Sequence, residues 1–148
     1  MRRLWALLLV AAVGCGAPPA PVAAKSGTGE LRTDLDPLLT RFPALDGTTG
    51  ARWMSGTRGR ADVPGPSTYW IDAVVELPAA RVEELVSAHS PTDEGRSPDV
   101  VDGMRDHLPA GPFLTGAALD AAFHRGSWSA SAHLARGTGR LVLVATGG

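Results

Sequence analysis

Residues 68–77 carry the strongest structural pattern in the sequence, because apolar and mixed positions alternate over this whole stretch. The apolar set consists of Tyr69, Ile71, Ala73, Val75 and Leu77. Alternate side chains of a β-strand point to the same side of a sheet, so this set forms one apolar face. Burying that face removes apolar area from water at about 25 cal/mol per Å². The pattern therefore predicts a β-sheet core built around this strand.

The C-terminal residues predict a β-hairpin that belongs to the same sheet. Residues 127–135 alternate strictly between apolar and polar positions, residues 137–139 supply a turn, and residues 140–146 return as a second strand. Residues 141–144 are all apolar and leave neither face polar. We expect this last strand to be central in the sheet and buried on both faces.

Further elements are predicted from local signals. A short strand with Trp53 is expected at residues 51–55, and residues 58–66 are expected to form a loop because prolines and glycines interrupt any ladder. Helices are expected at residues 34–42, after Pro78, from Ser97 and after Thr115, where capping residues or prolines precede apolar stripes. Together these elements predict one α+β domain, with a three- to four-stranded antiparallel sheet and two or three helices packed on one face.

The first fifteen residues have the organisation of an export signal. Arg2 and Arg3 precede an uninterrupted apolar run of ten residues, 4–13, which is too short to cross a bilayer as a permanent helix. The sequence at 12–15, Ala-Val-Gly-Cys, resembles the lipobox of bacterial prolipoproteins, although Ala12 stands where leucine is usual. The resemblance implies cleavage before Cys15, a diacylglycerol on its thiol and anchoring to the outer face of a bacterial membrane. The alternative is an ordinary signal peptide cleaved after residue 24, which would release a soluble secreted protein.

The chain is therefore divided into a signal peptide at 1–14, a lipid-anchored flexible linker at 15–30 and a folded domain at 31–148. Proline, glycine and other small residues fill most of the linker and cannot form a core. Cys15 is the only cysteine, so the domain has no internal disulfide. The net charge of −1 becomes about −3 once the two arginines of residues 1–14 are removed. This balance argues against a nucleic-acid partner.

One group of residues suggests a binding surface. Aromatic side chains and arginines gather on either side of the loop at 58–66, and the candidates for ligand contact are Trp53, Arg58, Arg60, Tyr69 and Trp70. Tyr69 and Trp70 are adjacent on a strand and must point to opposite faces, so we expect one of them to be exposed or covered by a partner. Exposed aromatic rings near arginines are suited to glycan, peptide or anionic-polymer recognition. The alternative is that the indoles are core and the arginines keep the loop soluble.

No motif indicates catalysis, a cofactor or a metal. The four histidines lack ligand spacing, and His133 is expected to be solvated on the polar face of its strand. These features favour an envelope lipoprotein that acts as a non-enzymatic binding or interaction module, with the membrane and an envelope protein or glycan as partners. A second hypothesis is a small envelope hydrolase in which His133 converges with Asp72 or Glu76. A third is a purely structural or stress-related lipoprotein.

Overall fold

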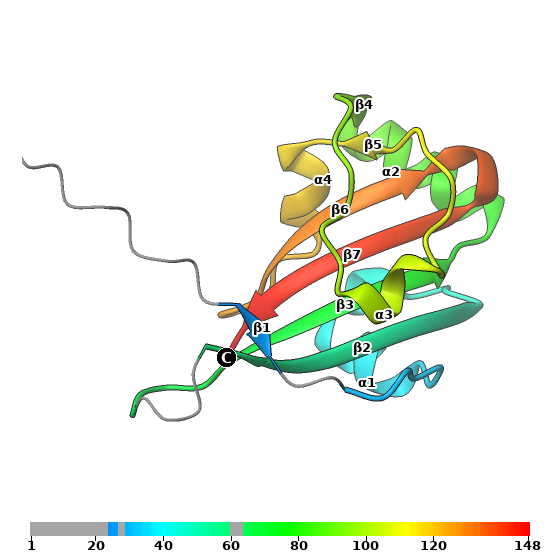
Figure 1. The fold of residues 1–148 in the computed structure, drawn as a ribbon. Helices are drawn as coiled ribbons and strands as arrows, with labels where there is room; N and C mark the ends of the chain where they lie inside the picture. Colours follow the sequence, from blue (N-terminus) through cyan, green and yellow to red (C-terminus); the bar gives the residue numbers. More distant parts are fainter. Residues whose placement is uncertain (1–23, 27–28, 60–63) are drawn as a thin grey trace, which may run out of the picture.

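The described residues form a seven-stranded antiparallel sheet with four α-helices packed against it (Figure 1). The computed structural model describes residues 24–26, 29–59 and 64–148. The strand order is β1-β2-β3-β7-β6-β5-β4. The predicted α+β class is confirmed, whereas the predicted sheet of three or four strands is too small.

Four long strands form the body of the sheet. They are β2 (Gly50–Arg58), β3 (Thr68–Glu76), β6 (Ser129–Ala135) and β7 (Arg140–Gly147). The other three strands are two residues long: β1 (Lys25–Ser26), β4 (Thr92–Asp93) and β5 (Leu114–Thr115). A two-residue strand has no alternation to recognise, which is why the sequence pattern did not predict these edge strands.

Strand β7 lies between β3 and β6 at the centre of the sheet, as its apolar sequence predicted. Leu141, Val142 and Leu143 are all fully buried. In β3, the odd-numbered residues from Ile71 to Val75 face one side and the even-numbered residues face the other, and both sets are buried. The sheet is therefore covered on both faces over most of its length.

Three helices supply apolar side chains to the core on one face of the sheet. They are α1 (Asp36–Arg41), α2 (Ala79–His89) and α4 (Ala117–Ala122). Their buried residues, together with those that follow α1 and α4, are Leu38, Phe42, Leu45, Val82, Leu85, Leu119 and Phe123. Helix α4 begins after Gly116, so the predicted capping role of Thr115 is wrong. Thr115 instead ends β5, where its buried hydroxyl lies 3.5 Å from the Glu94 carboxylate.

The opposite face is covered by α3 (Asp102–Arg105) and the extended segment before it (Figure 1). The helix predicted to start at Ser97 begins only at Asp102. The Val101 backbone N–H donates to the Asp72 carboxylate at 2.7 Å, and Val100 is buried against the sheet. Because the segment crosses the sheet in an extended form, Val100 and Met104 both reach the second part of the core.

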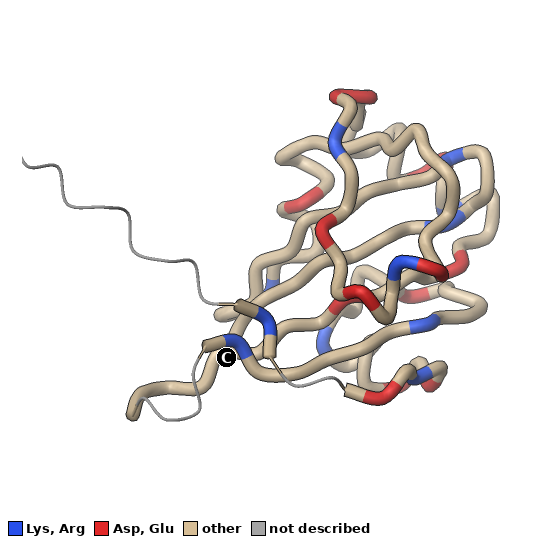
Figure 2. Tube along the Cα trace, viewed as in Figure 1, with Lys and Arg blue, Asp and Glu red and all other residues tan. Residues whose placement is uncertain are grey.

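The N-terminal strand β1 lies inside the stretch predicted to be a flexible linker. Lys25 pairs with Arg58 and Ser26 pairs with Thr57 at the end of β2. Charged residues lie mostly on helices, loops and strand ends (Figure 2), and Asp72 is the buried exception within the sheet. The predicted signal peptide, 1–14, and the predicted lipidation site Cys15 lie outside the described residues, and no described helix is long and apolar enough to cross a membrane.

Candidate functional site

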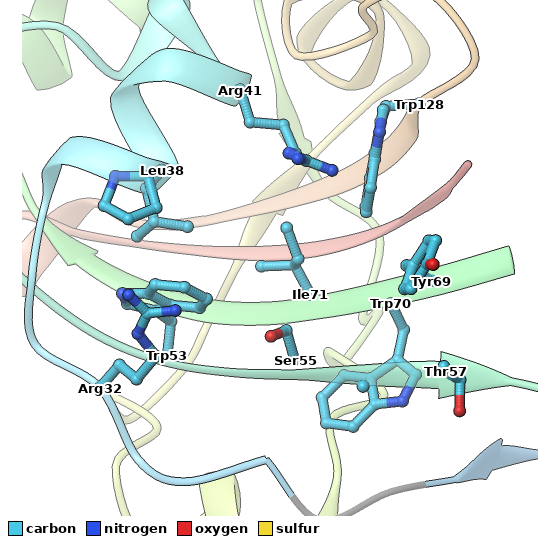
Figure 3. A pocket seen from close by; sticks show the side chains of 12 residues that line it. Arg32, Leu38, Arg41, Trp53, Ser55, Thr57, Tyr69, Trp70, Ile71 and Trp128 are labelled. Atoms are coloured by element: carbon cyan, nitrogen blue, oxygen red, sulfur yellow. The ribbon is translucent and has the colours of Figure 1, made fainter. Parts of the chain in front are cut away.

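A cleft of about 450 Å³ lies on the α1 side of the sheet, near the end where β2 finishes and β3 begins (Figure 3). It exists because α1 is only six residues long and leaves the last part of this sheet face uncovered. The cleft is lined by Arg32, Pro37, Leu38, Arg41, Trp53, Ser55, Gly56, Thr57, Tyr69, Trp70, Ile71 and Trp128. We call it the aromatic–arginine cleft.

One wall of the cleft is formed by Trp53 and Arg32. The Trp53 indole is almost fully buried and donates its N–H to the Asp34 backbone oxygen at 2.8 Å. The Arg32 guanidinium lies 4.2 Å from the centroid of the Trp53 ring. Arg32 also forms a bidentate ion pair with Asp34, and this pairing lowers the pKa of the Asp34 carboxyl. The charge of Arg32 is therefore already balanced within the protein.

The other wall is formed by Trp128 and Arg41. The Arg41 guanidinium lies 4.6 Å from the centroid of the Trp128 ring, and Phe42 meets the same ring edge-on at 5.9 Å. Gly147 lies directly against the indole, because a Cβ atom there would be only 2.6 Å from Trp128 Cγ. Trp128 is thus fixed by its neighbours and supports the Arg41 side chain.

Between these walls the sheet provides a mixed floor. Ile71 is largely buried, Ser55 and Thr57 bring hydroxyl groups, and Tyr69 is 44% exposed. Trp70 is 1% exposed and lies on the far side of β3, where its indole N–H donates to the Ser26 backbone oxygen at 3.1 Å (Figure 3). The prediction that one of the two adjacent aromatic residues is exposed is confirmed, and that residue is Tyr69.

The predicted arginines do not lie with the predicted aromatic residues. Trp53 and Tyr69 line the cleft, and Trp70 contributes to the lining although its indole packs on the other side of β3. Arg58 alternates to the other face of β2 and lines a different cleft together with Lys25. Arg60 lies outside the described residues. The arginines that do stack on the indoles are Arg32 and Arg41, which come from the segment before β2. No local pattern in the sequence relates Arg41 to Trp128, since their contact depends on how α1 packs.

Two further clefts of about 470 and 460 Å³ lie on the opposite face of the sheet. Lys25 and Asp99 line both of them, and the Lys25 ammonium is held by the Asp72 carboxylate and the Asp99 backbone oxygen. Size therefore does not distinguish the three clefts. The aromatic–arginine cleft differs because it combines stacked guanidinium groups, hydroxyls and an exposed aromatic ring.

The side chains of the hydrolase hypothesis occupy separate environments. Asp72 accepts two hydrogen bonds from Lys25, at 2.7 and 2.8 Å, and Glu76 forms an ion pair with Arg140 at 3.5 Å. His133 pairs with Val142, whereas Asp72 pairs with Val144, so His133 lies two strands away from Asp72 and is offset from it by two residues along the sheet. These side chains do not form the convergent acid–base group that the hypothesis requires.

His133 is 5% exposed, so the prediction of a solvated histidine is wrong. Phe113 meets its ring edge-on at 6.1 Å, and Nδ1 has no hydrogen-bond partner among the described residues. Burial lowers the pKa of His133 because desolvation penalises the charged imidazolium. Burial likewise raises the pKa of Asp72, and the Lys25 ammonium opposes that rise.

The remaining histidines lie near helix ends. His89 ends α2, His107 follows α3, and His124 follows α4, where its Nε2 is 3.2 Å from the Ala130 backbone oxygen. Within the part of the chain that the structure describes, no three histidine, cysteine or carboxylate side chains are grouped so that they could hold a metal ion.

The fold and the cleft together define a small α+β domain with a seven-stranded antiparallel sheet and an aromatic–arginine cleft at one end of it. Scans against protein-family models, curated proteins and solved structures found no match.

Proposed function

We propose that this chain is an exported envelope lipoprotein whose folded domain is a non-enzymatic binding module. Its ligand site is the aromatic–arginine cleft, and its anchor is a lipid on Cys15 at the outer face of a bacterial membrane. The single observation that carries the proposal is the cleft itself, in which two tryptophan–arginine stacks flank an uncovered stretch of sheet. An envelope protein or glycan and the membrane are the partners that this placement suggests.

The geometry of the cleft supports a binding role. Its volume falls within the range of small-molecule sites, which combine apolar walls with a few placed polar groups. Ser55, Thr57 and Tyr69 stand on two paired strands, so their positions relative to one another are fixed by the sheet. A site built on paired strands loses little entropy when a ligand binds.

A non-enzymatic role is favoured because the groups best suited to acid–base chemistry are engaged elsewhere. The Asp72 carboxylate is held by Lys25 and the Val101 N–H, and Glu76 pairs with Arg140. None of these residues lines the aromatic–arginine cleft. A ligand that binds there is therefore expected to leave chemically unchanged.

The binding role can be tested by native mass spectrometry of the protein isolated from its own envelope. Ser55→Trp places a large ring in the cleft without removing a core residue, and Arg105→Ala on α3 is the control. We expect the wild type and Arg105→Ala to carry a small ligand that Ser55→Trp lacks. If Ser55→Trp retains the same ligand at the same occupancy, the assignment of the site is wrong.

The anchor is tested by the mass of the native N-terminus. Acylated Cys15 at the N-terminus is the expected result, and Cys15→Ser is expected to release the protein from the membrane fraction. A mature chain that begins at Lys25 without acyl mass would replace the tethered module with a freely diffusing one. Both processing sites retain Lys25, so the ion pair with Asp72 is available in either product.

A further inference from the structure

The aromatic–arginine cleft carries one positive charge that no carboxylate of the described residues balances. Arg32 is paired with Asp34, whereas Arg41 makes no ion pair or hydrogen bond with any described residue, and its guanidinium lies over the Trp128 ring. No aspartate or glutamate is among the residues that line the cleft. The site is therefore electropositive, and Arg41 is the source of that charge.

The Arg41 guanidinium lies against an aromatic ring that is itself held in place. It stacks on Trp128, and the indole is itself fixed by Phe42 and by close contact with Gly147. A stacked guanidinium keeps its N–H edge available, and that edge matches the two oxygens of a carboxylate or phosphate. Because the stacking restricts the side chain before binding, less entropy is lost when the anion arrives.

The rest of the lining is mixed, with apolar surface beside polar groups. The accessible apolar surface comes mainly from the Tyr69 ring, which is 44% exposed, because Ile71 and Leu38 line the cleft but are only 6% and 1% exposed (Figure 3). A small hydrated anion would use the guanidinium and leave this apolar surface in water. An anion attached to an apolar body would use both, with the hydroxyls of Ser55 and Thr57 between them.

We propose that the ligand of the aromatic–arginine cleft is an anionic amphiphile. Its carboxylate or phosphate head lies against the Arg41 guanidinium, and its apolar body lies along the Tyr69 ring and the accessible edge of Ile71. This inference rests on the proposed binding function and names the chemistry of its ligand. A fatty carboxylate and a lipid phosphate present the same chemistry to the site, so the experiment must separate them.

Three probes with the same ten-carbon chain test the proposal: decanoate, decyl phosphate and the neutral decyl glucoside. Each is titrated below its micelle concentration into the mature chain, and binding is followed by calorimetry. The variants are Arg41→Ala, Arg41→Lys and the control Arg105→Ala. Melting temperatures of all the variants separate a loss of binding from a loss of fold.

At least one of the two anions is expected to bind, and the glucoside at least tenfold more weakly. Loss of a charge-assisted hydrogen-bonding pair corresponds to roughly a tenfold to hundredfold loss of affinity, so Arg41→Ala should fall in that range and Arg105→Ala should match the wild type. Arg41→Lys should recover only part of the affinity, because an ammonium cannot make the planar two-point contact. Preference for decanoate would identify a fatty carboxylate as the source, and preference for decyl phosphate a lipid phosphate.

Equal binding of all three probes, or anion binding that Arg41→Ala leaves unchanged, would overturn the inference. So would a failure of all three probes to bind. In each case the proposed function stands if the envelope-derived ligand is still excluded by Ser55→Trp. The two proposals therefore fail through different measurements.

Discussion

Replacing Lys25 with methionine removes the ammonium from a buried ion pair while keeping a side chain of similar length. Lys25 is the only lysine in the sequence, and its ammonium lies 2.7 Å from an Asp72 carboxylate that is completely buried. The pair attaches β1 to the far side of β3, across the end of the sheet. After the substitution, the Val101 N–H still donates a hydrogen bond to the Asp72 carboxylate.

The loss of stability in Lys25→Met depends on how well the buried Asp72 carboxylate is stabilised once the ammonium is gone. Breaking a fully buried pair by removing one partner costs about 3–5 kcal/mol. The Lys25 side chain is 15% exposed, so water can reach the site, and the Val101 N–H still stabilises the charge. We therefore expect Lys25→Met to lower the free energy of unfolding by about 2–3 kcal/mol at neutral pH.

The loss of folding stability caused by Lys25→Met must also depend on pH. Burial already raises the pKa of Asp72 above its ordinary value of 3.8, and loss of Lys25 raises that pKa further. A carboxyl whose folded pKa lies above its unfolded value destabilises the protein as pH rises through the folded pKa. The deficit of Lys25→Met is therefore largest at neutral pH and shrinks as the pH falls towards 3.8 and Asp72 takes up a proton.

Urea denaturation of wild type and variant across this pH range measures both effects. Arg140→Met is the matched control, because the Arg140–Glu76 pair is much more exposed, with side chains 38% and 45% accessible. That control should cost at most about 1 kcal/mol. A Lys25→Met deficit as small as the control, or one that does not change with pH, would refute the reasoning.

Three further substitutions probe other parts of the fold. His133→Phe should remove a pH dependence of the stability. The folded pKa of His133 lies below its unfolded value of 6.5, so the wild type loses stability as the pH falls through 6.5. Urea midpoints measured on either side of that pH should differ for the wild type more than for the variant. Leu143→Ala empties a fully buried position at the centre of the sheet and should cost about 2–5 kcal/mol in the same assay, and a cost below about 1 kcal/mol would contradict the central placement of β7. Gly147→Ala should push Trp128 out of place, lower the stability by about 1–3 kcal/mol and change the tryptophan fluorescence, whereas an unchanged spectrum would contradict the close packing.

Long periodic segments were predictable from the sequence alone. Strand β3, the hairpin of β6 and β7, and helix α2 each repeat one pattern over seven or more residues, and the apolar run of β7 placed it at the centre of the sheet. In these elements the local pattern and the tertiary environment favour the same structure.

The prediction failed where tertiary contacts override local signals. The helix signal at Ser97 is strong, but an extended segment that crosses the sheet buries Val100 there. It also lets the Val101 N–H donate to the Asp72 carboxylate. His133 lies on an alternating strand whose polar face was expected to be exposed to solvent. That face is covered by a segment outside the strand, which includes Phe113.

The candidate site was predictable only in part. Trp53 and Tyr69 were identified because aromatic residues near arginines are distinctive, and both line the cleft. Arg58 points to the other face because side chains alternate along β2. The arginines that line the cleft are instead Arg32, which lies over Trp53, and Arg41, which lies over Trp128. These contacts join separate segments of the chain and cannot be predicted from local residue spacing.

The most direct test of the account is a ¹H–¹⁵N shift map of the mature protein, titrated with the small-molecule fraction released from the wild-type protein. If the aromatic–arginine cleft is the ligand site, the largest shifts fall on the indole N–H of Trp128, the side-chain N–H of Arg41 and the backbone amides of Ser55 and Tyr69, and Ser55→Trp abolishes them. Shifts concentrated instead around Lys25 and Ser131, on the opposite face of the sheet, would contradict it.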